Sequence, residues 1–464
     1  MIFSKIYCSK IKANNSRFDG KYFLNESSYL SMKVEDIPHS LPLSDIAEVF
    51  NPTIFKRQFC LKSEHSTYYF QSSDVPSASE KGNVYISREQ SKKLNLLVNR
   101  GDILVTGFGS IGNTRLVNKC QHEVCYANNV CRIRVKKGSF SGFIYAFISS
   151  KYGIAQLNKN ASGSVVRYIE APGIKRTIIP NVTESLKIEI DQLIQDSILL
   201  REEAADELEA ADKLLKEKAG LRPLTPEDYD YFGQHSATRK PSCFTRRSNE
   251  ISSRSINAFN YSQRLERLKE SLPDSRPLRN ILLNNTTFST GSFPRIEVKK
   301  GNGVMLINQS DAFDTIINGK WISTRNVNLS NLVSYGEVII AGVGTLGENE
   351  TFCRALFANE DLKGQLISGE FIRMKTTRDI PSGFLYAWLT SDYGFRLIRG
   401  TQAGTKLCRP IPEAFLDIPV PILAEEDMKE IDRMVRDAHS KRHLANVKEL
   451  KAIAMVEAEI EKWN

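Results

Sequence analysis

The sequence predicts a mixed fold, α/β (α+β), in which two similar globular domains are each followed by a long helix. Three observations support this prediction: the chain contains an internal repeat, short stretches alternate polar and apolar residues as strands do, and two long stretches carry an apolar seam of helical spacing. With 464 residues the chain is too long for a single hydrophobic core. Its 41% hydrophobic and 25% charged residues are typical of soluble globular proteins.

Two glycine-containing stretches carry the clearest sign of the repeat. GDILVTGFGSIG at 101–112 and GEVIIAGVGTLG at 336–347 place three glycines at matched positions, with an offset of 235. Further along, SGFIYAFISSKYG at 141–153 matches SGFLYAWLTSDYG at 382–394, with an offset of 241. Residues 141–180 and 382–421 share ten identities in forty aligned positions. The second copy therefore has six extra residues between these two stretches.

The repeat divides the chain into five segments. We predict a first globular domain at 1–182, a long helix at 183–222, a linker at 223–253, a second globular domain at 254–422 and a long helix at 423–464. The linker is rich in Pro, Ser and Arg and has little periodicity. Five basic residues lie in or directly after the linker, and two alternatives are open for them, contact with phosphate or a solvated loop: Arg239, Lys240, Arg246, Arg247 and Arg254.

Both predicted long helices carry an apolar seam. The first seam consists of Ile190, Leu193, Leu200, Ala204, Leu208, Ala211 and Leu215. The second, which is less regular, consists of Ile431, Val435, Ala438, Leu444, Val447, Leu450, Ala454 and Ile460. A long helix needs a partner to bury such a seam, so we expect an antiparallel coiled coil. The alternative is that each helix packs only on its own globular domain.

The glycine stretches have the Gly-x-Gly-x-x-Gly spacing of a dinucleotide-binding loop. Such a loop opens a helix, with its phosphate at the helix N-terminus. Here the residues after Gly112, NTRLVNKCQHEVCYANNVCRIRV, alternate like a strand, and those after Gly347 carry no helical stripe. The glycines therefore predict a turn between strands, where close backbone approach or a positive φ is needed.

The cysteines and the N-terminus indicate the compartment. The eight cysteines are widely spaced, and neither a secretory signal nor an apolar run long enough to cross a membrane is found. We expect a cytoplasmic protein with reduced thiols and no membrane partner. Cys120, His122, Cys125 and Cys131 leave two alternatives open: a zinc site, or small buried side chains, which the alternation of VCYANNVCRIRV favours.

No pattern in the sequence supports a catalytic site. The sequence contains no GKS/GKT phosphate loop and no HExxH, and Asn51-Pro52-Thr53 differs from the Asn-Pro-Pro-aromatic motif of amino-methyltransferases. No Gly-x-Ser-x-Gly precedes a helix with suitable partners. We therefore expect a protein that is not an enzyme and that holds no cofactor and no metal.

The net charge of +9 is unevenly distributed along the chain. Residues 183–219 carry eleven acidic and five basic side chains, and residues 423–464 carry ten acidic and eight basic ones. The long helices thus have net charges of −6 and −2, which leaves +17 on the globular domains and the linker. A basic domain suits the phosphates of a duplex, so double-stranded DNA is the expected partner.

The order and doubling of these motifs resemble the specificity subunit of type I restriction-modification systems. GDILVTGFGSIG and GEVIIAGVGTLG are similar to the family's GDIL…GTIG-type stretch. ASGSVVRYIEAPGIKRTIIP and QAGTKLCRPIPEAFLDIPVP are similar to its glycine-containing segment before the long helix. SRFDGKYF at 16–23 is similar to the Arg-[IL]-Asp-x-x-Tyr-Tyr opening of a target-recognition domain, and RSINAFNY at 254–261 is a more distant copy, with Asn257 where Asp is usual.

The resemblance implies that each globular domain is a target-recognition domain with a twisted, largely β core, and that each reads one half of a split DNA site. It implies that the helical pair sets the gap between the half-sites and docks DNA adenine methyltransferase subunits, which extrude and methylate an adenine. A translocating restriction subunit joins these partners when the system restricts DNA in phage defence.

Candidate DNA contacts follow from side-chain chemistry in the segments after Gly163 and Gly404. Arg167, Lys406 and Arg409 have the chemistry to bind guanine or phosphate, and Ser164 and Thr405 add hydroxyl groups. The remaining cationic candidates are Arg115, Arg132, Arg88 and Arg325. The alternative for each is an ordinary surface cation. Four matched tyrosines lie in apolar helical stretches and are expected in the core: Tyr145, Tyr152, Tyr386 and Tyr393.

Three rival functions remain open at this point. The chain could be a specificity-like subunit of another defence system. It could be a catalytic protein, such as a nuclease or an S-adenosylmethionine enzyme. It could also be a structural coiled-coil adaptor whose globular ends bind protein. Neighbouring genes, methyl transfer by the purified chain and the salt dependence of duplex binding distinguish these three.

Overall fold

The computed structural model describes most of the chain, which divides into two units. Unit 1 comprises Met1–Glu202 and Leu444–Asn464, and unit 2 comprises Glu203–His443. The described residues are 6, 8–13, 20–23, 25–60, 62–79, 82, 84–163, 166–225, 228, 243–252, 254–347 and 350–463. Most of the predicted linker therefore lies outside the described residues.

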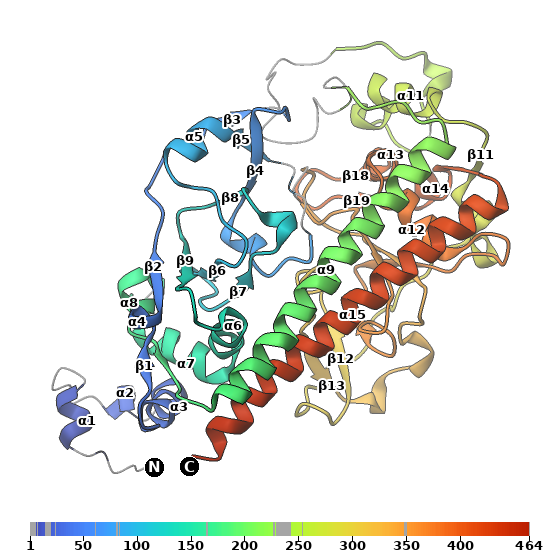
Figure 1. Ribbon diagram of the computed structural model, residues 1–464. Coiled ribbons are helices and arrows are strands. Elements are labelled where there is room, and N and C mark those ends of the chain that lie inside the picture. The colour runs from blue at the N-terminus through green and yellow to red at the C-terminus, as the bar shows by residue number, and fades with distance from the viewer. Residues whose placement is uncertain are drawn as a thin grey trace. The chain divides into compact units, whose positions relative to one another are not determined.

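Unit 1 is built around two four-stranded sheets (Figure 1). In the first, the order is β2-β9-β6-β7, and its pairs are antiparallel. Its strands are β2 (Ala47–Phe50), β9 (Val130–Val135), β6 (Ile103–Thr106) and β7 (Thr114–Leu116). The second has the order β3-β5-β4-β8, with β4 and β8 parallel. Its strands are β3 (Phe59–Cys60), β5 (Tyr85–Ser87), β4 (Ser66–Phe70) and β8 (Cys125–Tyr126).

Short helices and one further strand pair complete unit 1. The strand pair is β1 (Leu41–Pro42) with β10 (Ile178–Ile179). The helices before the first sheet are α1 (Cys8–Ala13), α2 (Gly20–Phe23), α3 (Glu26–Glu35) and α4 (Leu43–Ile46). The later ones are α5 (Arg88–Lys93), α6 (Ser141–Ser149), α7 (Lys151–Asn160), α8 (Ala171–Lys175) and the long α9 (Glu184–Lys218).

Unit 2 contains the corresponding strands in smaller sheets. The sheet β15-β14-β17 is antiparallel, and in β13-β12-β16 the strands β12 and β16 are parallel. These strands are β12 (Val304–Ile307), β13 (Lys320–Ile322), β14 (Val338–Ala341), β15 (Ala355–Phe357), β16 (Leu366–Ile367) and β17 (Phe371–Met374). Two further pairs are β11 (Ser275–Pro277) with β20 (Pro419–Pro421), and β18 (Gln402–Ala403) with β19 (Arg409–Pro410). The helices are α11 (Gln263–Glu270), α12 (Ser382–Thr390), α13 (Asp392–Arg399), α14 (Pro412–Leu416) and α15 (Glu425–Glu461).

The repeat predicted from the sequence is a structural repeat with one register. In unit 1, Ile103 of β6 pairs with Leu116 of β7. The residues at offsets 235 and 241, Val338 and Phe357, pair in the same way in unit 2. The six extra residues of the second copy therefore fall between Gly347 and β15. The mixed α/β (α+β) class of both domains is confirmed.

Within each unit, the two long helices run side by side and antiparallel (Figure 1). In unit 1, Lys448 pairs with Asp196 at 2.9 Å, and Arg201 pairs with Glu449 at 2.7 Å. In unit 2, Lys441 pairs with Glu207 at 2.7 Å, and Lys218 with Asp427 at 3.0 Å. The boundary between the units falls within both helices, so each unit contains one part of each.

The seam predicted for the second helix is correct only in its first half. Ile431, Val435 and Ala438 are buried, as is Ile460 near the end. The predicted Leu444, Val447 and Leu450 are instead 48%, 48% and 49% exposed, and Ala454 is exposed as well. The buried face here is formed by Ala445, Ala452 and Val456. Small alanines allow the helix to approach its neighbours closely, and the larger leucines are left outside.

The main core of each unit lies between its sheet, its short helices and its part of the helical pair. In unit 1, Ile190 and Ile194 of α9 and Val456 of α15 join the core with Phe143 of α6. In unit 2, Leu215, Ile431 and Val435 join the core of Trp388 and Phe384 on α12. Burial of this apolar surface stabilises the attachment of each globular copy to the helices.

Candidate DNA interface

The acidic residue that opens each glycine stretch is a buried anchor. Asp102 accepts a hydrogen bond from the backbone of Asn99 at 2.9 Å and pairs with Arg134 at 2.9 Å. This bond raises the pKa of the Arg134 guanidinium. In unit 2, Glu337 accepts from the backbone of Ser334 at 2.9 Å and pairs with Arg373 at 2.8 Å. The carboxylates thus fix the start of β6 and β14 and are not available to a ligand.

The first motif glycine allows a close backbone approach. A Cβ at Gly107 would lie 2.5 Å from the carbonyl oxygen of Ile169, and one at Gly342 would lie 2.6 Å from that of Glu370. After the glycines the chain enters β7 in unit 1 and β15 in unit 2 rather than a helix. The predicted turn between strands is confirmed, and the geometry is not that of a dinucleotide site.

A second glycine loop follows α7 and α13. In unit 1, Ser162 and Tyr168 exchange backbone hydrogen bonds of 2.8 and 2.9 Å around Gly163, which has a φ of +90°. In unit 2, Ala403 of β18 pairs with Arg409 of β19 around Gly404, which has a φ of +104°. Residues other than glycine rarely adopt these φ values, so the glycines make both tight turns possible.

The two glycine loops of each copy are paired with each other. We call residues 107–112 with 162–163 and 166–168, and residues 342–347 with 402–410, the paired loops. In unit 1 an antiparallel bridge joins Phe108 and Tyr168. In unit 2 a bridge joins Gly344 and Cys408, whose N–H donates to the Gly344 carbonyl at 2.7 Å. At offsets 235 and 241 these two bridges belong to one register. The structure thus brings together two segments that are about 60 residues apart in the sequence.

Most of the predicted DNA contacts on the paired loops are exposed. Arg167 is exposed, and its guanidinium donates to the carbonyl oxygen of Asn158 at the end of α7. Thr405, Lys406 and Arg409 are exposed on the second copy. Thr345 donates to the backbone carbonyl of Lys406 at 3.5 Å, which leaves the lysine ammonium out of that contact. Ser164 lies outside the described residues.

Three other predicted cations lie away from the paired loops or are partly engaged. Arg115 is half-buried and donates to the carbonyl oxygen of Val75 at 2.8 Å. Arg88 is half-buried at the start of α5 and pairs with Glu123 at 3.4 Å. Arg325 is exposed in a short 3-10 turn of unit 2. Their contact with DNA remains a prediction.

Arg132 requires a correction. Its side chain is fully buried, and its guanidinium donates to the backbone carbonyl oxygens of Asn95, Leu96 and Leu97. Burial lowers its pKa to about 10. Its strand also carries Arg134 two residues later, so alternation directs both toward one face of the sheet. Arg132 is therefore a core residue that holds a loop, and it does not belong to the candidate interface.

A stacked aromatic pair on the paired loops of unit 1 was not predicted. Phe108 is 39% exposed and Tyr168 is 37% exposed, with ring centroids 5.5 Å apart and an interplanar angle of 13°. Arg167 and the exposed Val166 directly precede Tyr168 in the chain. The sequence offered one signal, an aromatic residue between two motif glycines, but no pattern indicated that Tyr168 would be its neighbour.

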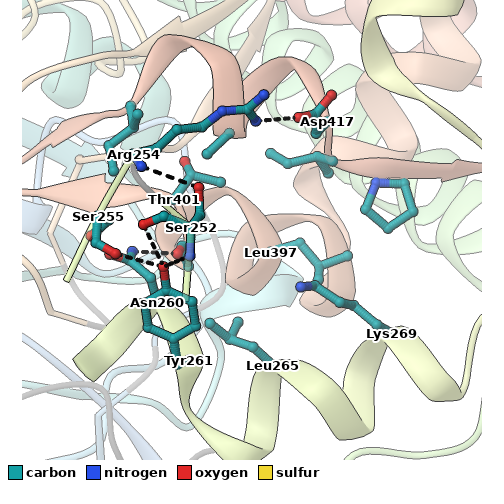
Figure 2. A pocket seen from close by; sticks show the side chains of 15 residues that line it. Ser252, Arg254, Ser255, Asn260, Tyr261, Leu265, Lys269, Leu397, Thr401 and Asp417 are labelled. Carbon is teal, nitrogen blue, oxygen red and sulfur yellow. Dashed lines mark hydrogen bonds and ion pairs between the residues drawn. The ribbon is translucent and has the colours of Figure 1, made fainter. Parts of the chain in front are cut away.

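The opening segment of the second domain, residues 254–261, supports the hairpin formed by β18 and β19. A pocket of about 220 Å³ lies beside this segment. Figure 2 shows side chains that line it. Asn260 donates to the backbone carbonyl of Gly400 at 2.5 Å and to that of Gln402 at 3.0 Å. Tyr261 accepts from the backbone of Ser252 at 2.9 Å, and Arg254 pairs with Asp417 at 2.5 Å (Figure 2). These contacts engage polar groups around the pocket, which indicates a structural role.

The two described arginines of the linker differ in their surroundings. Arg246 donates to the backbone carbonyl of Tyr261 at 2.7 Å, and Arg247 is exposed. Arg239 and Lys240 lie outside the described residues, as do residues 16–19 of the first opening motif.

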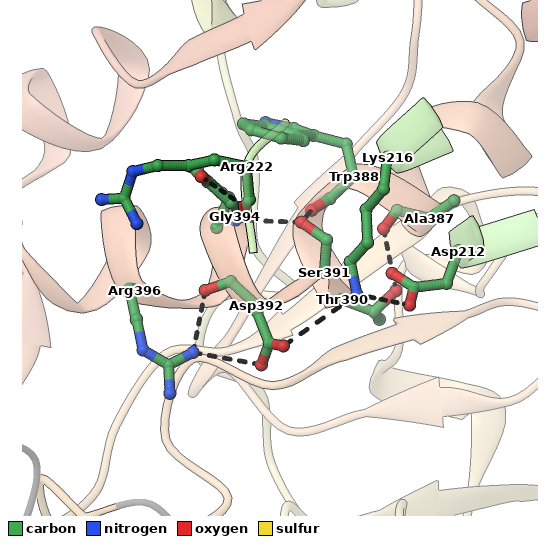
Figure 3. Close-up of polar contacts among 11 residues, drawn as sticks. Asp212, Lys216, Arg222, Ala387, Trp388, Thr390, Ser391, Asp392, Gly394 and Arg396 are labelled. Atoms are coloured by element: carbon green, nitrogen blue, oxygen red, sulfur yellow. Dashed lines mark hydrogen bonds and ion pairs between the residues drawn. The ribbon is translucent and has the colours of Figure 1, made fainter. Parts of the chain in front are cut away.

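A serine caps the helix that leads into each hairpin. In unit 2, Ser391 accepts from the backbone of Gly394 at 3.1 Å and donates to the carbonyl of Trp388 at 2.6 Å (Figure 3). Asp392 in the next position pairs with Arg396 at 3.2 Å, and Lys216 of α9 lies 4.0 Å from the Asp392 carboxylate. In unit 1, Ser150 makes the corresponding cap. The caps fix the direction of α7 and α13 and hence the position of the second glycine loop.

Buried tyrosines and cysteines complete the surroundings of the site. The four matched tyrosines are buried, as predicted: Tyr145, Tyr152, Tyr386 and Tyr393. Cys125 and Cys131 are also buried, and burial raises the pKa of each thiol to about 12. Among the residues that the structure describes, no group of three His, Cys, Asp or Glu side chains is placed to hold a metal ion. No described helix carries an apolar stretch that could span a membrane.

Comparisons with known proteins give no match to a family model or to a curated protein. Among solved structures, the chain is similar to the S subunit of a type I restriction-modification system from M. genitalium. The identity is 14% and the TM-score 0.36, over 95% of this chain and 97% of that one. It is similar to the HsdS subunit from Thermoanaerobacter tengcongensis at 14% identity and a TM-score of 0.26, over 92% of this chain and 97% of that one. The chain is also similar to a type IIG restriction endonuclease, BpuSI, at 8% identity and a TM-score of 0.29. This similarity covers 39% of this chain and 29% of the BpuSI chain.

Proposed function

We propose that this chain is the DNA-recognition subunit of a type I restriction-modification system, and that each globular copy reads one half of a bipartite duplex site. The observation that carries the proposal is the doubling of the paired loops. Both copies hydrogen-bond the same two glycine loops in the same register, and each presents at least one exposed cation. A split site requires two such surfaces, and each unit contains one.

The charge distribution supports a duplex partner. The globular copies and the linker together carry a charge of +17, whereas both long helices are acidic. Arg167, Lys406 and Arg409 supply donors on the paired loops, and a guanidinium can reach both O6 and N7 of guanine in the major groove. Thr405 can donate to a base or a phosphate. Arg88, Arg115 and Arg325 would contact phosphates that position the duplex without specifying its sequence.

The exposed apolar side chains of the helical pair support partner docking. In unit 1, Leu444, Val447 and Leu450 of α15 and Ile188 and Leu199 of α9 are each between 47% and 52% exposed. Leu444, Val447 and Leu450 are spaced by three residues, so they follow one side of the helix. Exposed apolar residues gathered on a helix mark a protein-binding surface. We assign this surface to the DNA adenine methyltransferase subunits, with a translocating restriction subunit joining them.

The chemistry of modification and cleavage would then belong to the partners. The role of this chain is to select the sequence at which a partner extrudes and methylates an adenine. The length of the two long helices would contribute to the spacer between the half-sites.

Sequencing of methylated bases in the source genome tests this proposal. With the gene intact, we expect methyladenine in one motif of two short blocks separated by an unspecified spacer, and we expect this motif to lose its methylation when the gene is deleted. Unchanged methylation would contradict a role in modification. Methyl transfer from S-adenosylmethionine by the purified chain alone would instead favour the catalytic rival.

A further inference from the structure

The paired loops of the two copies present different chemistry at matched positions. In unit 1, Phe108 and Tyr168 lie opposite each other and stack. At offsets 235 and 241 the equivalent positions in unit 2 are Val343, which is half-buried, and Arg409, which is exposed. The first copy thus exposes two aromatic rings at the place where the second copy exposes a guanidinium.

We infer that the stacked pair Phe108–Tyr168 reads an A·T base pair through the 5-methyl group of its thymine. This inference rests on the proposed function and names the base chemistry that the first copy selects. Thymine is distinguished in the major groove by its methyl group, which apolar side chains contact. An arginine at the same place, as in the second copy, suits guanine instead.

The exposure of the two rings supports a binding role. Phe108 and Tyr168 are each more than one-third exposed although each carries a large aromatic ring. Val166, two residues before Tyr168 in the chain, is 63% exposed, so the same loop exposes a further apolar side chain. Contact with a methyl group would remove part of this surface from water, which is favourable.

The backbone around the rings makes them a rigid surface. Ile169 donates to the carbonyl oxygen of Gly107 at 2.8 Å, and Tyr168 and Ser162 exchange hydrogen bonds on the other side. The rings also stack on each other and have only two side-chain torsions each, so little conformational entropy is lost when DNA binds. Arg167, next to Tyr168, would hold the phosphate or a neighbouring base while the rings contact the methyl group.

The test uses the full-length chain and a duplex that it selects from a random pool. Each thymine of the selected site is replaced in turn by uracil, which pairs identically but lacks the methyl group. For the natural chain we expect one position in one half-site at which uracil weakens binding about fourfold, the loss expected for one methyl group removed from an apolar contact. This penalty should disappear in Phe108→Ala and persist in Tyr168→Phe, which keeps the ring.

The matched control is Val343→Ala, the equivalent position in the second copy, which should leave the penalty unchanged. Thermal unfolding of each variant shows whether the fold is retained, and Phe108→Leu offers a second, apolar replacement without a ring face. The inference is wrong if no uracil substitution weakens binding, if the penalty survives in Phe108→Ala, or if that variant loses affinity equally for all duplexes. A pool in which no sequence is enriched would overturn the proposed function itself, which is a distinguishable result.

Discussion

The backbone N–H of Gly142 donates to the carboxylate of Asp191 at 2.6 Å and so joins the first turn of α6 to the long helix α9. In unit 2, Gly383 of α12 donates to Asp432 of α15 at 2.7 Å, and both pairs are 49 residues apart in the chain. The carboxylate lies at a helix N-terminus, where the helix dipole favours a negative charge. This repeated contact fixes each globular copy on its own long helix.

Replacement of Asp191 by alanine should destabilise unit 1. The change leaves a helix N-terminal N–H without its charged acceptor, and we expect a loss of about 1–2 kcal/mol in the free energy of unfolding. Gly142→Ala should have a similar or larger effect because its Cβ would lie 2.9 Å from Asp191 Oδ1. Urea unfolding measures both. Asp437→Ala, whose partner Arg433 is on the same exposed helix surface, is the control and should change little.

The buried acid of the second glycine stretch should matter more than that of the first. Glu337 and Arg373 are each 1% exposed, so Glu337→Ala leaves a buried guanidinium without its carboxylate and should cost about 3 kcal/mol or more. In unit 1, Arg134 is 35% exposed and can regain water when Asp102 is removed, so Asp102→Ala should cost less. Denaturant unfolding of the two variants gives the comparison, and equal losses would argue against the assigned role of burial.

Arg167→Ala should affect one half-site and leave the other unchanged. If Arg167 reads a base, the variant should accept several bases at one position, with a loss of about 1–3 kcal/mol against the preferred base. If affinity falls equally for all sequences and the salt dependence weakens, Arg167 binds phosphate instead. Arg132→Ala is the informative control, because it should lower stability while the folded protein keeps its base preference. Binding to duplexes with single base changes, at two salt concentrations, separates these outcomes.

Acid should destabilise unit 2 through His439. This residue of α15 is buried against the rings of Phe357 and Tyr386. Burial, with a smaller contribution from Arg442, lowers the pKa of His439 well below 6.5. Below about pH 6.5 the unfolded chain takes up a proton that the folded chain resists. Stability is therefore retained above that pH and falls as the pH drops, by up to about 1.4 kcal/mol per pH unit.

His439→Leu should remove this part of the pH dependence. Free energies of unfolding at pH 7.5, 6.5 and 5.5 should fall less steeply in the variant than in the natural chain. His65→Leu, at a side chain that is 87% exposed, is the control and should keep the natural slope. Identical slopes for all three proteins would show that His439 does not contribute.

Substitution of the exposed leucines of α15 should separate folding from partner binding. Leu444→Ser and Leu450→Ser remove apolar side chains that are about half exposed, so the free energy of unfolding should change by about 0.5 kcal/mol or less. Co-purification with the methyltransferase subunits should be lost. Ala445→Leu should instead lower the free energy of unfolding, because it places a larger side chain on the fully buried face of the helix. Retained co-purification in both serine variants would exclude this surface as the docking site.

The repeat could be read from the sequence because register and motif spacing are local properties. Matched glycines and the FIYAFI and FLYAWL stretches predicted equivalent turns and helices, and β6 and β14 follow at the expected offset. The turn after Gly112 was also predictable, since alternation after it excluded a helix.

Packing between distant segments could not be predicted in this way. Helical spacing alone placed Leu444 in the seam, whereas the neighbouring Ala445 is the buried residue. A close approach between helices favours small side chains, which a ranking by hydrophobicity places below leucine. Similarly, Arg132 has the charge of a DNA contact, and only its carbonyl partners 35 to 37 residues away show that it is a core residue. The stacking of Phe108 on Tyr168 depends on the pairing of two loops that no sequence pattern relates.

Selection of duplexes from a random pool by the full-length chain shows whether each globular copy reads its own half-site. We expect the enriched sequences to share two short conserved blocks, separated by a spacer of constant length and variable sequence, and we expect Arg409→Ala to relax one block only. Enrichment of a single continuous block, or of no sequence at all, would contradict the assignment of one half-site to each copy.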